Sequence, residues 1–118
     1  MEINKAWDFK TSQTITLNSK QYNVHECIAK AKDLPVVDLD VNTMNIAYDC
    51  PNSNTIRSFV EHMKSVMEAD LDYPIILNED GCIIDGRHRL CKALYLGKAT
   101  IKARRFNSDD DASYEWVD

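Results

Sequence analysis

Residues 55–69 carry the clearest helical pattern in the chain. Their apolar side chains recur at positions i, i+3, i+4, i+7, i+10 and i+11, which is typical of one face of an α-helix. Ser53 or Asn54 is expected to cap this helix by accepting a hydrogen bond from one of its first amides. We interpret the stripe as core packing rather than a ligand-binding face, because Met and Phe commonly fill hydrophobic cores. The stripe consists of Ile56, Phe59, Val60, Met63, Val66 and Met67.

Shorter hydrophobic patterns predict the helices and strands in the first half of the chain. Two alternating runs around a polar turn predict a hairpin over residues 14–24. Helical spacing that stops before Pro35 predicts a helix from about 24 to 33. Alternation over 36–41 predicts a strand with Val37, Leu39 and Val41 on one face. Residues 42–54 show no sustained period and predict a long loop, a length that often serves binding.

The second half alternates between strand and helix. Apolar runs at 74–77 and 82–84 flank a turn sequence and predict a pair of strands. Helical spacing predicts a helix over 86–96 that ends at Gly97, and alternation over 99–106 predicts the last strand. These elements predict an α/β (α+β) fold with a small mixed sheet and packed helices.

The length of the chain indicates a single domain. With 118 residues and no internal repeat or linker, it can bury one hydrophobic core. We divide it into an N-terminal hairpin and helix (1–32), a core (36–106) and an acidic tail (107–118). The tail is expected to be solvated and partly disordered, with binding of a protein partner or intramolecular screening of the basic face as the alternatives. No apolar run approaches the roughly 20 residues that cross a bilayer, and residues 1–5 lack the features of a secretion signal.

Cysteine spacing gives no sign of a metal or redox site. Pairs such as CxxC, which bring two thiolates to one metal, are absent from the sequence. We therefore expect ordinary thiols, no bound metal at the cysteines, and a cytoplasmic protein in a reducing compartment. The cysteines are Cys27, Cys50, Cys82 and Cys91.

Charge is unevenly distributed along the chain. The formal net charge of −5 disfavours general adhesion to nucleic acid, because that binding depends on Lys and Arg displacing counterions. The stretch from Gly86 to Phe106 nevertheless has no acidic residue. Its cations are Arg87, Arg89, Lys92, Lys98, Lys102, Arg104 and Arg105.

The candidate chemistry is concentrated at Asp85, Gly86, Arg87, His88 and Arg89, where the predicted second strand turns into a helix. Asp85 suits the N-cap, and Gly86 permits close approach to the backbone. The first helical turn has unpaired amides and the positive end of the helix dipole. Cations there cost about 0.3–1 kcal/mol each when exposed, which a bound phosphate would offset. The alternative is a simple i,i+4 salt bridge from Asp85 to Arg89 while His88 packs or faces water.

The segment Tyr73 to Arg105, YPIILNEDGCIIDGRHRLCKALYLGKATIKARR, resembles the ParB/sulfiredoxin superfamily in the order and spacing of its elements. The strand at 36–41 and the helix at 55–69 fit the elements that precede this block in the family, whereas residues 1–32 have no assigned counterpart. The resemblance implies a phosphate site lined by Gly86, Arg87, His88 and Arg89. Partition ParB proteins hold CTP phosphates with a Gly-Glu-Arg-Arg stretch here, and free serine kinases use Asp-Gly-His-His-Arg, whose Asp matches Asp85.

Positions at which this sequence differs from the family reduce the number of functions that the resemblance implies. Arg87 stands where sulfiredoxins have their nucleophilic Cys, so sulfinate repair is not expected. The few residues after the predicted last strand leave no room for the helix-turn-helix and dimerisation parts of a partition ParB, so centromere-style binding is not expected either. The catalytic carboxylate of the kinases is not identified, with Asp38, Asp40 and Asp49 all open. A nuclease would need metal-binding carboxylates such as Asp80 and Asp85.

We therefore expect a protein that binds a nucleotide or another phosphorylated small molecule. Phosphohydrolase or phosphotransferase chemistry would involve Asp85 and His88 and a nucleoside triphosphate with Mg²⁺. One alternative is a ParB-like DNA-binding protein or nuclease that contacts nucleic acid through residues 87–105. Another is a non-enzymatic regulator or inhibitor that acts by protein contact through the acidic tail.

Overall fold

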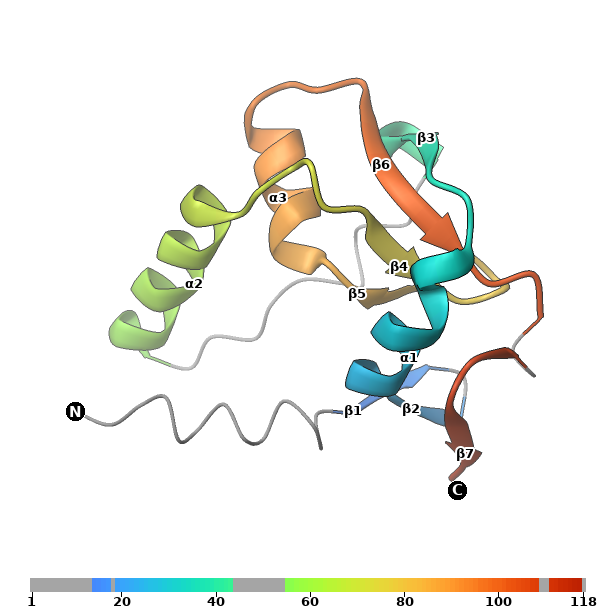
Figure 1. Cartoon of the computed structure of the whole chain (residues 1–118). Helices are drawn as coiled ribbons and strands as arrows, with labels where there is room; N and C mark the ends of the chain where they lie inside the picture. The colour runs from blue at the N-terminus through green and yellow to red at the C-terminus, as the bar shows by residue number, and fades with distance from the viewer. Residues whose placement is uncertain (1–13, 18, 44–54, 109–110, 118) are drawn as a thin grey trace.

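The computed structural model describes residues 14–17, 19–43, 55–108 and 111–117. They form an α+β fold of three α-helices and two β-sheets (Figure 1). The predicted fold class and mixed sheet are confirmed. The helices are α1 (Val24–Lys30), α2 (Ile56–Glu68) and α3 (Arg87–Tyr95).

The larger sheet has the strand order β3-β6-β4-β5. Its central strands β4 and β6 run parallel, because the chain crosses over through β5 and α3 between them, and the outer pairs are antiparallel. The predicted hairpin, helix and last strand of this region are confirmed. The strands are β3 (Val37–Asp40), β4 (Ile75–Leu77), β5 (Ile83–Asp85) and β6 (Thr100–Arg105).

Alternation along the central strands divides the core in two. Ile75 and Leu77 point to the side covered by α3, where they pack with Leu90 and Ala93. Ile76 points to the opposite side, toward a second cluster that includes residues of α1 and the smaller sheet. Successive strand residues face opposite sides of a sheet, so β4 supplies both cores. Both faces of this strand are therefore buried, which explains its continuous apolar sequence.

The smaller sheet corrects the prediction for the C-terminal tail. Its order is β1-β2-β7, with β1 (Thr14–Leu17) and β2 (Lys20–Asn23) forming the predicted hairpin. Strand β7 (Tyr114–Trp116) pairs antiparallel with β2, and Ala112 is buried. The tail is thus structured over 111–117 because the apolar positions between its acidic residues cover the hairpin. The acidic residues of this segment favour a disordered tail when composition is considered by itself, so this strand was not predicted.

Helix α2 corrects two further predictions. Its N-cap is Thr55, whose Oγ1 accepts a hydrogen bond from the Ser58 amide at 3.0 Å, rather than Ser53 or Asn54. No residue of the helix is buried, and five of the six residues of the predicted core stripe are exposed, with Ile56 at 84% and Phe59 at 57% of full accessibility. The sixth, Val66, is half-buried. The helix touches the rest of the described chain through a different side. The prediction of a helix is therefore confirmed, and the prediction that its apolar stripe packs in the core is wrong.

The remaining differences are small. The helix predicted to about residue 33 is α1 followed by a 3-10 turn, Ala31–Asp33. The strand predicted over 36–41 is shorter, and Val37 is exposed because β3 is an edge strand. Of the predicted loop at 42–54, residues 44–54 lie outside the described residues. No helix in the described part of the chain is long and apolar enough to span a membrane.

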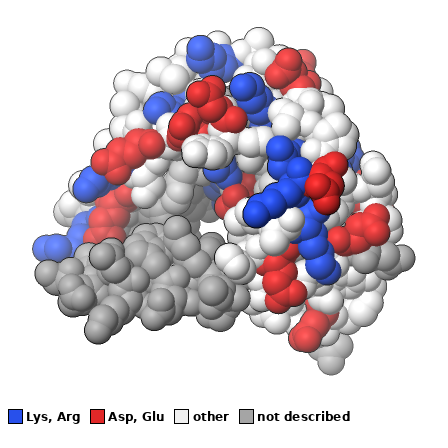
Figure 2. All heavy atoms as spheres, in the orientation of Figure 1, with Lys and Arg blue, Asp and Glu red and all other residues white. Residues whose placement is uncertain are grey.

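Surface charge shows no segregation on the face drawn in Figure 2, where acidic and basic side chains of the described residues are interspersed. Among the described cysteines, Cys27 is buried and Cys82 and Cys91 are half-buried. Cys50 lies outside the described residues.

Candidate functional site

The backbone turn from β5 into α3 requires glycine at position 86. Gly86 adopts φ +114° and ψ +21°, a left-handed conformation that residues with a Cβ rarely adopt. A Cβ at this position would lie 2.5 Å from Cγ2 of Ile75 and 2.8 Å from its Cβ. The close approach predicted for this glycine is therefore made by the buried β4 side chain.

Gly86, and not Asp85, is the N-cap of α3. Asp85 is the last residue of β5, and no side chain of the described residues caps the helix. The first bond within the helix runs from the Leu90 amide to the Gly86 carbonyl at 3.0 Å. Helix geometry gives the preceding amides no acceptor within the helix, so they provide a positive potential at this end.

Asp85 and Arg89 form the ion pair that the sequence offered as the alternative. Nη2 of Arg89 donates to Oδ2 of Asp85 at 2.7 Å, and the two side chains are 19% and 32% exposed. The Nε of Arg89 is buried and has no hydrogen-bond partner among the described residues. A buried guanidinium N–H without an acceptor is costly, so the guanidinium keeps an unused donor.

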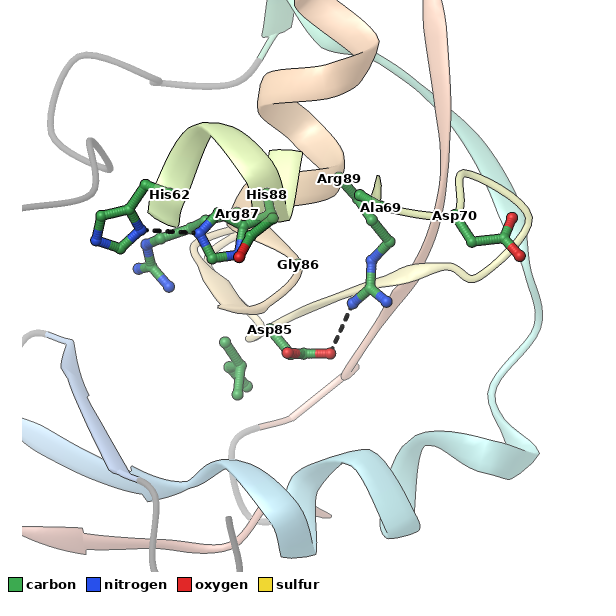
Figure 3. Close-up of a pocket in the computed structure, with 10 residues that line it drawn as sticks. His62, Ala69, Asp70, Asp85, Gly86, Arg87, His88 and Arg89 are labelled. Carbon is green, nitrogen blue, oxygen red and sulfur yellow. Dashed lines mark hydrogen bonds and ion pairs between the residues drawn. The ribbon is translucent and has the colours of Figure 1, made fainter. Parts of the chain in front are cut away.

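The other two basic side chains of the motif point elsewhere. Nη2 of Arg87 donates to the Ile83 carbonyl at 3.1 Å, which holds the guanidinium along β5. Nε2 of His88 lies 3.1 Å from Nδ1 of His62, so the two rings share one hydrogen bond between α3 and α2. Figure 3 shows the histidine pair and Arg87 on one side of Gly86, and the Arg89–Asp85 pair on the other.

The surroundings favour a neutral His88. Burial lowers its pKa below the ordinary value of 6.5, the neighbouring His62 and then Arg89 lower the pKa further, and Asp85 opposes them. His88 is therefore held as a neutral imidazole at physiological pH. In that form the ring can accept a proton, which is the property expected of a general base.

These groups line one cavity of about 410 Å³. This volume lies in the range of small-molecule sites. Its wall is formed by the end of β5, the start of α3 and the α3-facing side of α2. The polar lining residues are His62, Ser65, Asp70, Asp85, Arg87, His88 and Arg89.

All five residues predicted for the site thus line the same cavity. The candidate carboxylates do not: Asp38 and Asp40 lie on β3, at the opposite edge of the sheet from β5, and Asp80 lies in the β4–β5 turn. Asp49 lies outside the described residues. None of the three described carboxylates lines the cavity.

Sequence reasoning missed the contribution of α2 and of the turn that follows it. His62, Ser65 and Asp70 enter the cavity because α2 packs against α3, with Nζ of Lys92 donating to the carbonyls of Met67 and Ala69. The available signal was the polar side of α2, where His62 and Ser65 interrupt the apolar pattern. The spacing of residues along α2 does not predict which other helix its polar side contacts. Asp70 points away from Arg89 in Figure 3, and its Oδ1 accepts the amide of Asp72.

The rest of the basic segment is dispersed. Lys92 binds the end of α2, Arg104 donates to the Ala31 carbonyl, and Arg105 donates to the Glu79 carbonyl. The Nε of Arg104 is also buried without a hydrogen bond, but it lies outside the cavity. Among the described residues, no three His, Cys, Asp or Glu side chains are placed to hold one metal ion.

Comparisons of the chain with protein-family models, with curated proteins and with solved structures find no match. The resemblance to the ParB/sulfiredoxin superfamily accordingly stays a prediction.

Proposed function

We propose that the chain binds a nucleotide or another phosphorylated small molecule at the cavity in front of α3. The observation that carries this proposal is that the uncapped first turn of α3 and the Arg89 side chain line one cavity. Amides at a helix start and a guanidinium are the donors that phosphate oxygens prefer. The cavity volume of about 410 Å³ leaves room for a group larger than a free phosphate.

Asp85 competes with a bound phosphate for the Arg89 guanidinium. Its carboxylate already occupies one guanidinium nitrogen of Arg89 at 2.7 Å. This pair is half-buried. An i,i+4 pair on a helix surface is worth about 0.2–0.5 kcal/mol, so a doubly charged phosphate can displace or share it. Arg89 would then contact the phosphate through the part of its side chain that lines the cavity, with Asp85 keeping the guanidinium in place.

His88 is the group in this cavity best suited to chemistry. As a neutral imidazole bonded to His62, it can accept a proton from a water or hydroxyl that attacks a bound phosphoryl group. Phosphoryl hydrolysis or transfer is therefore our extension of the binding proposal. Mg²⁺ would enter with the nucleotide, because the ion usually takes most of its ligands from phosphate and water, and Asp85 would supply a carboxylate from the cavity.

Family membership is part of this proposal. The sequence of β4, β5, the Gly86 turn, α3 and β6 supports a ParB/sulfiredoxin-like fold. Of the alternatives, DNA binding or cleavage through residues 87–105 is less favoured, because much of that basic segment is engaged in contacts within the chain. A regulator that acts through the tail is also less favoured, because Tyr114–Trp116 is built into a sheet.

Isothermal titration calorimetry with ATP, CTP and GTP, each with and without Mg²⁺, tests the binding proposal. We expect one or more to bind the wild type, and Arg89→Ala to weaken binding at least tenfold. Loss of one charge-assisted hydrogen bond of about 1.5–3 kcal/mol corresponds to this change.

Lys102→Ala is the matched control, because it removes one positive charge from an exposed position on β6, outside the cavity. It should leave nucleotide affinity unchanged. Equal losses in both variants would indicate nonspecific attraction and contradict the site. No binding of any nucleotide or of inorganic phosphate to the wild type would also contradict it.

A further inference from the structure

The exposed apolar face of α2 is an interaction surface, and we propose that its partner is a second copy of this chain, bound with the two α2 helices antiparallel. The face comprises five large side chains, each more than half exposed: Ile56, Phe59, Val60, Met63 and Met67. We call this set the α2 apolar face. It is separate from the cavity, and the proposal goes beyond the phosphate-binding function.

The position of this face on the helix follows from helical geometry. At about 100° per residue, the half-buried residues Ser58, His62, Val66 and Ala69 form the side of α2 that meets α3. The α2 apolar face lies directly beside them and is left open by the described chain. Exposed patches of a few hundred Å² on a monomer commonly mark interaction sites.

The charge pattern beside the face identifies the partner. Arg57, Glu61, Lys64 and Glu68 form one row along the edge of the apolar face that is remote from α3. Figure 2 shows basic and acidic side chains alternating along the outer edge of the molecule over α2. The order +, −, +, − becomes −, +, −, + when it is read from the other end.

A two-fold axis makes this row complementary to itself. In an antiparallel pair, like edges of the two helices meet, so Arg57 lies opposite Glu68 of the other copy and Glu61 lies opposite Lys64. In a parallel pair, this row would face the α3 side of the partner helix instead. Charge pairing therefore selects the antiparallel arrangement.

The apolar side chains can pair under the same two-fold symmetry. An antiparallel pair of helices that is centred between residues 61 and 62 places Val60 opposite Met63 and Ile56 opposite Met67. The charge pairs are centred between residues 62 and 63, so the two patterns differ by a slide of two residues, or about 3 Å, between the helices. The long Arg, Lys and Glu side chains span this offset, so one antiparallel register serves both patterns.

The area predicts a weak dimer. Side chains of this size that are about half exposed offer roughly 300–500 Å² per copy, or about 600–1,000 Å² for the pair. Stable complexes bury about 1,200–2,000 Å², so the dimer should have a dissociation constant of roughly micromolar to millimolar.

Sedimentation velocity of the full chain, from about 10 μM to about 1 mM, measures this equilibrium directly. We expect a shift from monomer to dimer in the wild type, at least tenfold weakening in Met63→Glu and in Val60→Glu, and no change in Val37→Glu. Val37 is the matched control because it is also an exposed apolar residue, on edge strand β3. Far-UV circular dichroism should show unchanged helix content in every variant, since the substituted side chains are exposed.

Charge exchange tests the antiparallel register. E61K and K64E should each dimerise several-fold more weakly than wild type, because each places like charges opposite one another. An equimolar mixture of the two should form a heterodimer more tightly than either variant alone. A folded wild type that stays monomeric at the highest concentration, or a dimer indifferent to Met63→Glu, would overturn the proposal; a mixture with no preference for the heterodimer would overturn the register.

Discussion

Nδ1 of His62 and Nε2 of His88 lie 3.1 Å apart where α2 meets α3, and one hydrogen bond joins them. In such a bond one nitrogen carries the hydrogen and the other must offer a lone pair, so both rings cannot be doubly protonated while the bond is kept. Their ring centroids are 5.4 Å apart. The packing of α2 on α3, and with it one wall of the cavity, is therefore sensitive to protonation.

Stability should fall as the pH drops below 6.5. The pKa of His88 is lowered in the folded protein, mainly by burial and then by His62 and Arg89, whereas in the unfolded chain it returns to about 6.5. The unfolded state then binds more protons between the folded pKa and 6.5, so stability is complete above 6.5 and is lost as pH falls through the folded pKa. Urea unfolding at pH 7.5 and pH 5.5 measures the difference.

His88→Gln should flatten this dependence, because the titrating ring is gone. In NMR titrations, His62→Gln should raise the pKa of His88, since a neighbouring ring that lowers it has been removed. A wild-type His88 pKa at or above 6.5 would contradict the assignment of burial as the main cause.

Asp85→Asn should strengthen binding of nucleotide in the absence of Mg²⁺. The substitution removes a negative charge from the cavity and releases the guanidinium of Arg89 from its ion pair. We expect roughly a three- to tenfold gain, equivalent to about 1 kcal/mol. Calorimetry on both proteins gives the ratio. Weaker binding in this variant would show instead that Asp85 contributes directly to ligand recognition.

Gly86→Ala should destabilise the fold by about 2–5 kcal/mol. The left-handed backbone costs a Cβ-bearing residue about 1–2 kcal/mol, and the clash with the Ile75 side chain at 2.5 Å adds overpacking strain of about 1–3 kcal/mol. Gly97→Ala is the control, because Gly97 also has positive φ but its Cβ would meet nothing within 4 Å. Chemical denaturation should give the control a loss of about 1–2 kcal/mol; equal losses would disprove the role of Ile75.

Asn78→Ala should cost about 2–4 kcal/mol. Oδ1 of this buried side chain accepts the amides of Asp80 at 3.0 Å and Cys82 at 2.8 Å, which fixes the turn between β4 and β5. Both amides would lose their acceptor. Tyr22→Phe removes the weaker bond from Nδ2 of Asn78 to the Tyr22 hydroxyl at 3.3 Å, and it should cost about 1 kcal/mol. Thermal melts compare the two, and a larger loss in the Tyr22 variant would contradict the turn-fixing role.

Deleting residues 111–118 should lower the free energy of unfolding by at least about 2–3 kcal/mol. The deletion removes β7, the buried Ala112 and the Ser113 carbonyl that accepts the Asn23 amide at 2.9 Å. Trp116→Ala, at a side chain that is 69% exposed, should cost about 1 kcal/mol or less. A truncated protein as stable as the wild type would show that the tail is not part of the fold.

Local patterns determined most elements of this protein. The period of 3.6 in α2, the two short apolar runs around Asn78–Gly81, and Gly97 at the end of α3 each predict structure from interactions within a few residues. The residues that line the cavity at the start of α3 were also readable, because cations at a helix start conflict with the helix dipole.

Only the tertiary structure decided which surfaces meet. Periodicity shows that α2 has an apolar face, but burial depends on what packs against it, and in the described chain α3 takes the side bearing His62 instead. In the same way, Tyr114–Trp116 becomes a strand because β2 offers a free edge distant in sequence. The ion pair between Asp85 and Arg89 was foreseeable from i,i+4 spacing, whereas the pairing of His62 with His88 was not. Contacts between distant segments depend on the whole packing arrangement, which no local spacing encodes.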